Sequence, residues 1–439
     1  MKGEQLINGF SKLTKTEKLR WTVEQFGQDP TALERELRAF WLPDDERQAV
    51  LDGFSENTLS NFPMPYGIAP NFLINGRPYA VPMVIEESSV VAAASAAAKF
   101  WLDKGGFKTE VLGTTKLGQV HFRYFGGIDR LEAVFAELQT ALRNSVADIT
   151  ANMERRGGGV RDIELLDFTE RMPHYYQLRV SFETCDSMGA NFINSVLEQF
   201  GRTLERFCSE HPTFAEHERE VEIIMCILSN FTPDCLVRAE VSCPVEAFQM
   251  KGTDATGLEL ADTFARAIRI AEIDPYRAAT HNKGIYNGVD AVVLATGNDF
   301  RAVEACGHTY ASRDGRYTSL SHCTVEAGVF RFWLDLPLAV GTVGGLTKLH
   351  PLARTSLELL GRPSATELMQ IIAATGLAQN FAAVRSLVTT GIQRGHMKMH
   401  LQNILHHLGA DDTTAAAAHA HFAERAVSFG AVRKFVEEG

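Results

Sequence analysis

The segment from residue 117 to residue 230 constrains the fold more than any other part of the chain. Alternating apolar side chains predict strands at residues 119–125, 160–168, 174–182 and 221–228. A helix with an apolar stripe is expected between the first two strands, from Ile128 to Val146, and another between the last two, from Phe192 to Leu204. The resulting order, β-α-β-β-α-β, is that of a ferredoxin-like split βαβ unit.

The segments on either side mix helical and strand patterns, which predicts an α+β protein. Helices are expected in the first fifty residues, where Thr14 and Glu17 form a capping-box pattern. A strand at 79–85 and an alanine-rich helix at 88–102 follow. Further on, the apolar run 291–295 predicts a buried strand, and the chain has a helical pattern after Gly376.

Charge and cysteine content exclude several classes of protein. The 439 residues carry a net charge of −11, which argues against a protein that coats nucleic acid or an anionic membrane. The seven cysteines are scattered and never spaced C-x-x-C, so neither a disulfide framework nor a zinc site is expected. No apolar leader opens the sequence, and no apolar stretch reaches about 18 residues. We therefore expect a cytoplasmic protein with no metal and no nucleic-acid or membrane partner.

The common nucleotide-binding and hydrolase fingerprints are absent from the sequence. No G-x-G-x-x-G follows a predicted strand, and neither a P-loop nor a G-x-S-x-G motif occurs. A dehydrogenase with a Rossmann site is therefore disfavoured. The residues that could carry chemistry lie instead at the ends of apolar elements.

Three groups carry charges suited to carbonyl chemistry. Glu87 and Ser89 lie between the predicted strand and the alanine helix, where they either cap the helix or place an acid in a buried cleft. Arg277 and Lys283 lie in a predicted loop, either as solvated charges or as a clamp on a carboxylate and a carbonyl. Asp299 follows the apolar run 291–295 and either caps the next helix or holds a catalytic lysine.

Two further groups have a plain structural interpretation beside the functional one. Residues 186–191, DSMGAN, join a strand to a helix and suit either an ordinary N-cap or a phosphate bound at the helix N–H groups. His396 and His400 lie one helical turn apart, but Met397 replaces the Glu of a metalloprotease H-E-x-x-H motif. Without further information, these histidines fit a surface helix, and a general acid is the alternative.

Taken together, the motifs resemble the bacterial class II form of 3-hydroxy-3-methylglutaryl-coenzyme A (HMG-CoA) reductase. The resemblance runs from about residue 55 to the end, in family order and spacing, and the block 274–305 is the most specific part. The matching segments are NGRPYAVPMVIEESSVVAAAS (75–95), RGGGVRDIE (156–164), DSMGAN (186–191), DPYRAATHNKGIYNGVDAVVLATGNDFRAVEA (274–305), GTVGGLTKLHPLA (341–353), GLAQN (376–380) and GIQRGHMKMH (391–400).

The resemblance implies reduction of HMG-CoA to mevalonate and free CoA with two hydrides from NAD(P)H. Glu87 would be the acid that serves the mevaldehyde carbonyl, and Lys283 would stabilise the oxyanion formed when hydride attacks the thioester. Asp299 would hydrogen-bond both Lys283 and Glu87. His396 would protonate the departing CoA thiolate.

The resemblance also implies two binding sites. Arg277 would bind the HMG carboxylate, with Ser89, Asn287 and Gln379 nearby. The pyrophosphate of the cofactor would be held at the 186–191 turn by Asp186, Met188, Gly189 and Asn191. No metal is implied.

The implied architecture is a discontinuous large domain with an inserted domain and a flap. The large domain would comprise residues 1–114 and 231–375, the NAD(P)-binding domain residues 115–230, and a C-terminal helical flap residues 376–439. The flap would bring His396 over the site. Such enzymes are at least dimeric, with the active site at the subunit interface.

The resemblance further indicates which nicotinamide cofactor is used. Members selective for NADH carry an Asp seven residues before the GGG turn, and that position is Thr150 here. A threonine does not repel a 2′-phosphate, and Arg155 and Arg156 lie close in sequence. NADPH and mevalonate biosynthesis are therefore expected. The alternatives are an NADH-linked enzyme that degrades mevalonate, or a non-catalytic acyl-CoA-binding relative, which would need no acid, lysine and histidine together.

Overall fold

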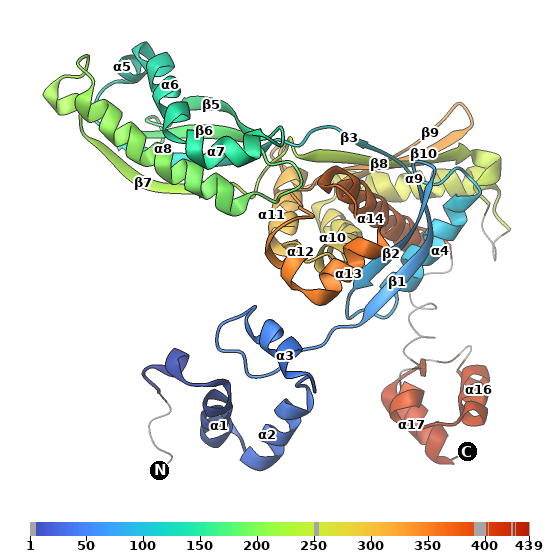
Figure 1. Cartoon of the computed structure of the whole chain (residues 1–439). Helices are drawn as coiled ribbons and strands as arrows, with labels where there is room; N and C mark the ends of the chain where they lie inside the picture. Colours follow the sequence, from blue (N-terminus) through green and yellow to red (C-terminus); the bar gives the residue numbers. More distant parts are fainter. Residues whose placement is uncertain are drawn as a thin grey trace.

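The fold is that of a mixed α/β protein with three sheets. The computed structural model describes residues 6–249, 254–389, 401–402, 404–422, 425 and 427–438. In this part of the chain, two four-stranded sheets and one two-stranded sheet are joined by helices. Figure 1 shows an elongated upper body with two small helical groups, near the two ends of the chain, that stand away from it.

The predicted split βαβ order is confirmed in the described elements. The strands are β4 (Lys116–Tyr124), β5 (Gly159–Asp167), β6 (Tyr175–Glu183) and β7 (Val221–Leu228), paired antiparallel in the order β5-β6-β4-β7. The first expected helix is divided into α5 (Ile128–Ala133), α6 (Phe135–Ser145) and α7 (Ala147–Glu154), and the second is α8 (Ala190–Glu210). These elements enclose a hydrophobic cluster of their own, so the unit has a separate core (Figure 1).

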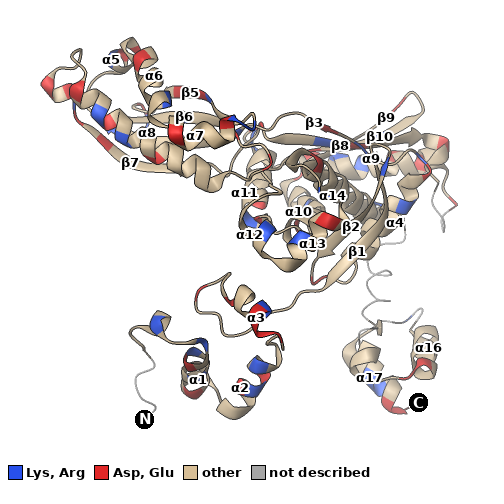
Figure 2. Ribbon diagram, in the orientation of Figure 1, with Lys and Arg blue, Asp and Glu red and all other residues tan. Residues whose placement is uncertain are grey.

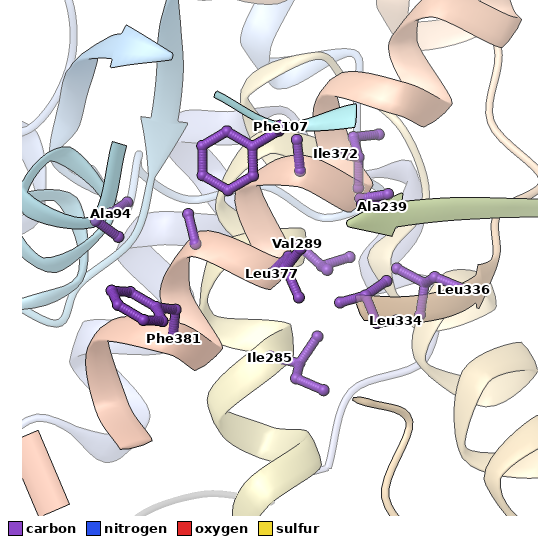
Figure 3. Close-up of a cluster of buried hydrophobic side chains, with 14 of the residues drawn as sticks. Ala94, Phe107, Ala239, Ile285, Val289, Leu334, Leu336, Ile372, Leu377 and Phe381 are labelled. Atoms are coloured by element: carbon purple, nitrogen blue, oxygen red, sulfur yellow. The ribbon is translucent and has the colours of Figure 1, made fainter. Parts of the chain in front are cut away.

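A second and larger core lies between a sheet and three long helices. The sheet has the order β3-β8-β10-β9, formed by Lys108–Val111, Leu236–Pro244, Val329–Pro337 and Ser321–Glu326. The helices are α9 (Gly257–Ile273), α10 (Pro275–Ala295) and α14 (Ala365–Val388). Figure 3 shows side chains of this core that are almost fully buried, among them Ala94, Phe107, Ala239, Ile285, Val289, Leu334, Leu336, Ile372, Leu377 and Phe381.

The two-stranded sheet carries the alanine helix. It is formed by β1 (Tyr66–Ile74) and β2 (Arg77–Val84), and the turn after β2 leads into α4 (Val90–Leu102). Ala94, Ala97 and Ala98 are buried in the large core, so the small side chains let α4 approach its neighbours closely.

Residues 275–295 form one helix, and the prediction of a loop followed by a strand at 291–295 was wrong. Helix α10 begins after the N-cap Asp274, whose carboxylate accepts from the N–H of Tyr276, and Pro275 occupies its first turn. Its second half is apolar on nearly every side because it runs through the core. A short apolar run of this kind does not distinguish a buried helix from a buried strand.

Helix α14 crosses the expected boundary at residue 376. It is one continuous element, and Leu377, Phe381 and Val384 belong to the large core. By length and composition α14 would suffice to span a membrane, but 72% of its most apolar window is buried inside the protein. It is therefore the central helix of the large core.

The remaining helices lie at the ends of the chain and beside the large core. The N-terminal group is η1 (Phe10–Lys12), α1 (Lys15–Phe26), α2 (Pro30–Ala39) and α3 (Asp45–Asp52), and the C-terminal group contains α16 (Asp412–His421) and α17 (Phe429–Glu438). The capping box at Thr14 and Glu17 is confirmed. Beside the large core lie α11 (Phe300–Ala311), α12 (Gly345–Leu349) and α13 (Pro351–Leu359), and two short 3-10 turns, η2 (Glu216–Glu218) and η3 (Val245–Ala247), complete the fold.

Helices α10 and α14 pack closely because each presents a glycine to the other. A Cβ on Gly288 would lie 2.8 Å from the Cβ of Gln379 and 2.8 Å from the carbonyl oxygen of Thr375. A Cβ on Gly376 would lie 2.7 Å from Cγ2 of Val289. Such contacts are too short to be made without moving a backbone, so the helix pair tolerates no larger residue here.

We expect Gly288→Ala to lower the free energy of unfolding by about 1–3 kcal/mol, because the added methyl group forces α10 and α14 apart. Gly284→Ala is the matched control on the same helix, since a Cβ there meets nothing within 4 Å. The control should be neutral or stabilising by about 0.5–1 kcal/mol, the usual gain for Gly→Ala inside a helix. Guanidinium unfolding followed by circular dichroism measures both, and equal effects of the two substitutions would contradict the packing account.

Candidate active site

Glu87, Lys283, Asn287 and Ser89 form one polar cluster. Lys283 Nζ lies 3.2 Å from Oε2 of Glu87, and Asn287 Nδ2 donates to the same oxygen at 3.4 Å. Ser89 Oγ donates to the other carboxylate oxygen, Oε1, at 3.3 Å. The cluster joins the turn after β2 to one face of α10, where Lys283 and Asn287 lie one helical turn apart.

The cluster differs from the expected buried cleft. The side chain of Glu87 is 33% exposed and that of Lys283 is 65% exposed, so both groups can be reached from solvent. Ser89 is the N-cap residue of α4, but its side chain makes no capping hydrogen bond and is used by Glu87 instead. The acid is therefore held by an ammonium, an amide and a hydroxyl.

Arg277 lies in the first turn of α10 and has no carboxylate partner. Its side chain is half-buried, and burial lowers the pKa of its guanidinium from the ordinary value. Within the described ranges, no ion pair or hydrogen bond of Arg277 is formed. A partly desolvated guanidinium without a counter-ion is suited to bind an anionic group in a bidentate manner.

Buried polar side chains of three elements form a chain of hydrogen bonds that begins at His281 of α10. The sequence did not single this residue out. His281 is only 2% exposed, and its Nε2 lies 2.7 Å from Ser321 Oγ, which donates to Asn380 Oδ1 at 2.8 Å. Because the Ser321 proton is used by Asn380, His281 must donate through Nε2–H. The chain ties α10 to β9 and α14.

Gln379 lies beside this chain on α14, and His396 lies outside the described residues. Gln379 is 5% exposed and packs against Gly288, and its Oε1 has no hydrogen-bond partner within the described part of the chain. In the same described ranges, no group of three or more His, Cys, Asp or Glu residues is arranged to hold a metal ion.

A groove of about 1530 Å³ lies next to the 186–191 turn. It is lined by residues of the segments 39–66, 187–192, 294–301 and 341–353. Met188, Gly189 and Asn191 line the groove, as does Asp299. The charged residues of its lining are Arg47, Asp299 and Arg301, and Figure 2 shows both acidic and basic residues on α3 and basic ones on α12 and α13.

The turn is fixed by backbone geometry and by contacts to the large core. Gly189 is the N-cap of α8 with φ +88°, and a Cβ there would lie 2.5 Å from Cγ2 of Thr184. Asp186 accepts from the N–H of Ala365 at 2.7 Å, so its carboxylate holds the turn to the first residue of α14. A parallel bridge joins Ser187 to Val343. Since Gly189 has no side chain, the N-terminus of α8 is left without a side-chain cap.

Asp299 does not contact Lys283 or Glu87 in this structure, contrary to expectation. It is the N-cap of α11 and accepts from the N–H groups of Arg301 and Ala302. The Arg301 guanidinium binds both carboxylate oxygens at 3.0 and 2.9 Å. This hydrogen bond to Arg301 is the main reason that the pKa of Asp299 is lowered. The capping interpretation is confirmed, and the nearby arginine takes the place expected for the lysine.

Thr150 also differs from its expected role. Its side chain is 1% exposed on α7, and its hydroxyl donates to the carbonyl of Ala147, so it presents no surface to a cofactor. Arg155 and Arg156 are exposed at the end of α7. The carbonyl of Arg156 lies 3.3 Å from Cys185 Sγ, next to the 186–191 turn. The backbone of Arg156, and not Thr150, therefore lies next to the turn.

Comparison with known proteins identifies the family. The sequence model described as hydroxymethylglutaryl-coenzyme A reductase matches residues 21–401. The chain belongs to this family. It is therefore an oxidoreductase. The 3-hydroxy-3-methylglutaryl-coenzyme A reductase of Archaeoglobus fulgidus is 36% identical over 404 residues, 92% of this chain and 87% of the relative. A probable reductase of Borreliella burgdorferi is 31% identical and covers 91% of this chain and 88% of its own length.

Solved structures of the family show the same fold. The class II reductase from Streptococcus pneumoniae, bound to NADPH in open conformations, is 36% identical with a TM-score of 0.69, covering 94% of this chain and 99% of that chain. A second structure of a reductase from that organism is 38% identical with a TM-score of 0.70 and covers 87% of this chain and 99% of that one. The mixed α/β fold thus matches class II reductases.

We expect His281 to make stability depend on pH in the acid range. Burial, followed by the nearby charge of Arg277, lowers the pKa of His281 from 6.5 to about 3. Between these values the unfolded chain binds a proton that the folded chain does not. Stability is therefore lost as pH falls from 6.5, by up to about 1.4 kcal/mol per pH unit.

His281→Gln keeps an N–H donor for Ser321 and removes the group whose protonation in the unfolded chain lowers stability. The free energy of unfolding of this variant, relative to that of the unchanged protein, should therefore rise as pH falls from 6.5 to 4.5. His217→Gln, at an exposed histidine, is the control and should follow the unchanged protein. Urea unfolding at a series of pH values measures the difference. Parallel pH curves for His281→Gln and the unchanged protein would show that His281 is not the group responsible.

Proposed function

We propose that this chain reduces HMG-CoA to mevalonate and free CoA, using two hydrides from NAD(P)H. The observation that carries the proposal is the ion pair between Lys283 and Glu87 at 3.2 Å, within a chain that belongs to this family. A cation and an acid held together, accessible to solvent, are the groups that reduction of a carbonyl requires. A purely acyl-CoA-binding relative would have no use for this pair.

Each proposed catalytic residue has a separate role in the reaction. The cofactor supplies hydride. Lys283 would stabilise the negative charge that develops on the thioester oxygen, which is the largest electrostatic demand of the reaction. Glu87 would then supply a proton at the mevaldehyde carbonyl, and His396 would protonate the thiolate of CoA. The role proposed for Asp299 requires its carboxylate to exchange Arg301 for Lys283 when the substrates are bound.

Substrate binding is proposed at the start of α10. Arg277 would bind the HMG carboxylate, because its guanidinium is half-buried and has no partner in the described structure. Ser89 and Asn287 would contact the substrate through groups that now hydrogen-bond Glu87. Gln379 would accept from the substrate through its unpartnered Oε1, which requires the α10–α14 region to open to the ligand.

The cofactor is proposed to bind along the groove, with residues 115–230 acting as an inserted cofactor domain. The fit rests on the open N-terminus of α8 at Gly189 and on the groove volume of about 1530 Å³. Met188 and Asn191 would contact the pyrophosphate, and Asp186 would hold the turn through α14. We favour NADPH, because Arg156 is exposed, its backbone lies next to the turn, and its side chain would attract a 2′-phosphate. NADH, in a mevalonate-degrading direction, is the alternative.

We expect Arg156→Ala to raise KM for NADPH by about tenfold, the loss of roughly one charge-assisted contact, while KM for NADH changes less than twofold. Arg171→Ala, an exposed arginine elsewhere in the same unit, is the control. Initial rates at saturating HMG-CoA measure both constants. A preference of the unchanged protein for NADH, or equal effects of Arg156→Ala on the two cofactors, would refute the proposed selectivity.

We propose a cytoplasmic homodimer or higher oligomer in which the active site lies at the interface and the C-terminal segment acts as a flap. Two observations support an interface near α10. Tyr276, next to Arg277, is 89% exposed, and Ile273 is 49% exposed. Large apolar side chains at this density on the surface are typical of a protein contact. Residues 401–438, where described, pack in a hydrophobic cluster of their own, as a separate flap would.

We expect Lys283→Ala and His396→Ala each to lower turnover by at least about a thousandfold, because each removes a group needed in a transition state. Lys99→Ala, at an exposed lysine of α4, should leave turnover unchanged.

Mixing the two inactive variants tests the interface. If Lys283 and His396 of one site come from different subunits, random dimers of the two variants contain one intact site in half of the molecules, and about a quarter of the activity returns. The mixture is denatured and refolded together, and NADPH oxidation is measured. No recovery would place both residues of a site on one subunit.

A further inference from the structure

Lys116 is a buried lysine with no ion-pair partner. It begins β4 and is 5% exposed. Its Nζ lies 2.5 Å from Thr184 Oγ1 and donates to the carbonyl oxygen of Ser187 at 2.8 Å. No carboxylate lies within 4.0 Å of Nζ in the part of the chain that the structure describes. Burial lowers the pKa of Lys116, and the nearby groups Cys235, Glu183, Cys185 and Asp186 act against the shift.

The ammonium lies directly behind the 186–191 turn. A cavity of about 20 Å³, enough for roughly one water molecule, is lined by Lys116 together with Met188, Ala190, Ala302 and Ala339. Met188 and Ala190 also line the large groove, but Lys116 does not. The turn is thus a wall between the two spaces, with the lysine charge on one side and the groove on the other.

The turn does not need Lys116 for its shape. Thr184 Oγ1 donates to the carbonyl of Ser187 at 2.6 Å, and the N–H of Ser187 donates to the carbonyl of Thr184 at 3.0 Å. The Ser187–Val343 bridge and the bond from Ala365 to Asp186 hold it from the other side. Lys116 adds two hydrogen bonds to neutral acceptors, which do not offset the several kcal/mol that desolvation of a charge costs.

When Lys116 is protonated, its charge acts in the same direction as the dipole of α8, whose N-terminus has no side-chain cap. Both then make the groove side of the turn more positive. Buried protein of low dielectric constant transmits such a field with less screening than water does. The ligand that gains most is a compact polyanion bound at the turn.

We propose that Lys116 is a positioning residue for the cofactor, whose buried charge makes the 186–191 turn bind the pyrophosphate of a nicotinamide dinucleotide. The proposal rests on the proposed function for the site, and it adds a group that acts through the turn without touching the ligand. The hydrogen bonds to Thr184 and Ser187 hold the ammonium in place, and its charge supplies the affinity.

The experiment compares Lys116→Met, Lys116→Gln and Lys116→Arg. Binding of NADPH is measured by its fluorescence without HMG-CoA, and binding of HMG-CoA by calorimetry. We expect the Met and Gln variants to raise Kd for NADPH at least tenfold, about 1.4 kcal/mol, with Kd for HMG-CoA changed less than twofold. KM for NADPH should rise with kcat at saturation unchanged, and Arg should restore binding to within about threefold. Lys108→Met, an exposed lysine on β3, makes the same change in net charge and should have no effect.

Two results would overturn the proposal. If Lys116→Gln binds NADPH with the same Kd as the unchanged protein, the hydrogen bonds donated by residue 116, and not its charge, support NADPH binding. If NADPH and HMG-CoA binding weaken together, Lys116 is a general structural residue. A different result would contradict the proposed function alone. In that case NADPH binding depends on Lys116 as expected, but the unchanged protein does not reduce HMG-CoA.

Discussion

The arrangement of the site depends on how closely α10 approaches α14. Gly288 and Gly376 remove the side chains that would keep the helices apart, and the His281–Ser321–Asn380 chain fixes their register within the core. Because α10 carries Arg277, Lys283 and Asn287, this packing fixes the positions of the side chains that are proposed to contact the substrate. A helix that packs against the core on one face is a better platform for a charged pair than the loop that the sequence suggested.

Charge is distributed unevenly between the surface and the site. The net charge of −11 is a sum over the whole sequence and does not describe the individual groups of the site. Arg277 has no counter-ion in the described structure, and Lys116 is buried without one. A cation that is desolvated without a counter-ion lowers the stability of the ligand-free protein. Binding of an anionic ligand near such a cation stabilises the folded state. The net charge argues against polyanionic surfaces as partners without bearing on anionic substrates.

Parts of the fold and of the candidate site could be predicted from the sequence where a pattern of residues is compatible with only one structure. The period-2 strands and amphipathic helices of residues 117–228 predicted the split unit, since apolar residues of β4, β5, β6 and β7 belong to its hydrophobic cluster or pack against it. The motif residues Glu87, Lys283, Asn287 and Ser89 were expected near one another and are so. Residues 291–295 were misassigned because the second half of α10 is buried on nearly every side and therefore has no amphipathic period.

Other features depend on tertiary contacts that one sequence does not encode locally. Asp299 pairs with Arg301, two residues away, because both lie in the first turn of α11, and the motif alone does not choose between Arg301 and Lys283. Thr150 is buried by the packing of α7, which its neighbours in sequence do not reveal. The burial of Lys116 follows from the approach of the 184–187 turn, more than sixty residues away along the chain.

The stoichiometry of the reaction tests the central claim most directly. The purified protein is incubated with limiting HMG-CoA and excess NADPH, and the loss of absorbance of NADPH is compared with the free thiol that appears. The account predicts two NADPH oxidised for each CoA thiol released, because the thioester is taken through the aldehyde to the alcohol. One NADPH per thiol would show that reduction stops at the aldehyde, and thiol release without oxidation would show a hydrolase; either result would contradict the assignment.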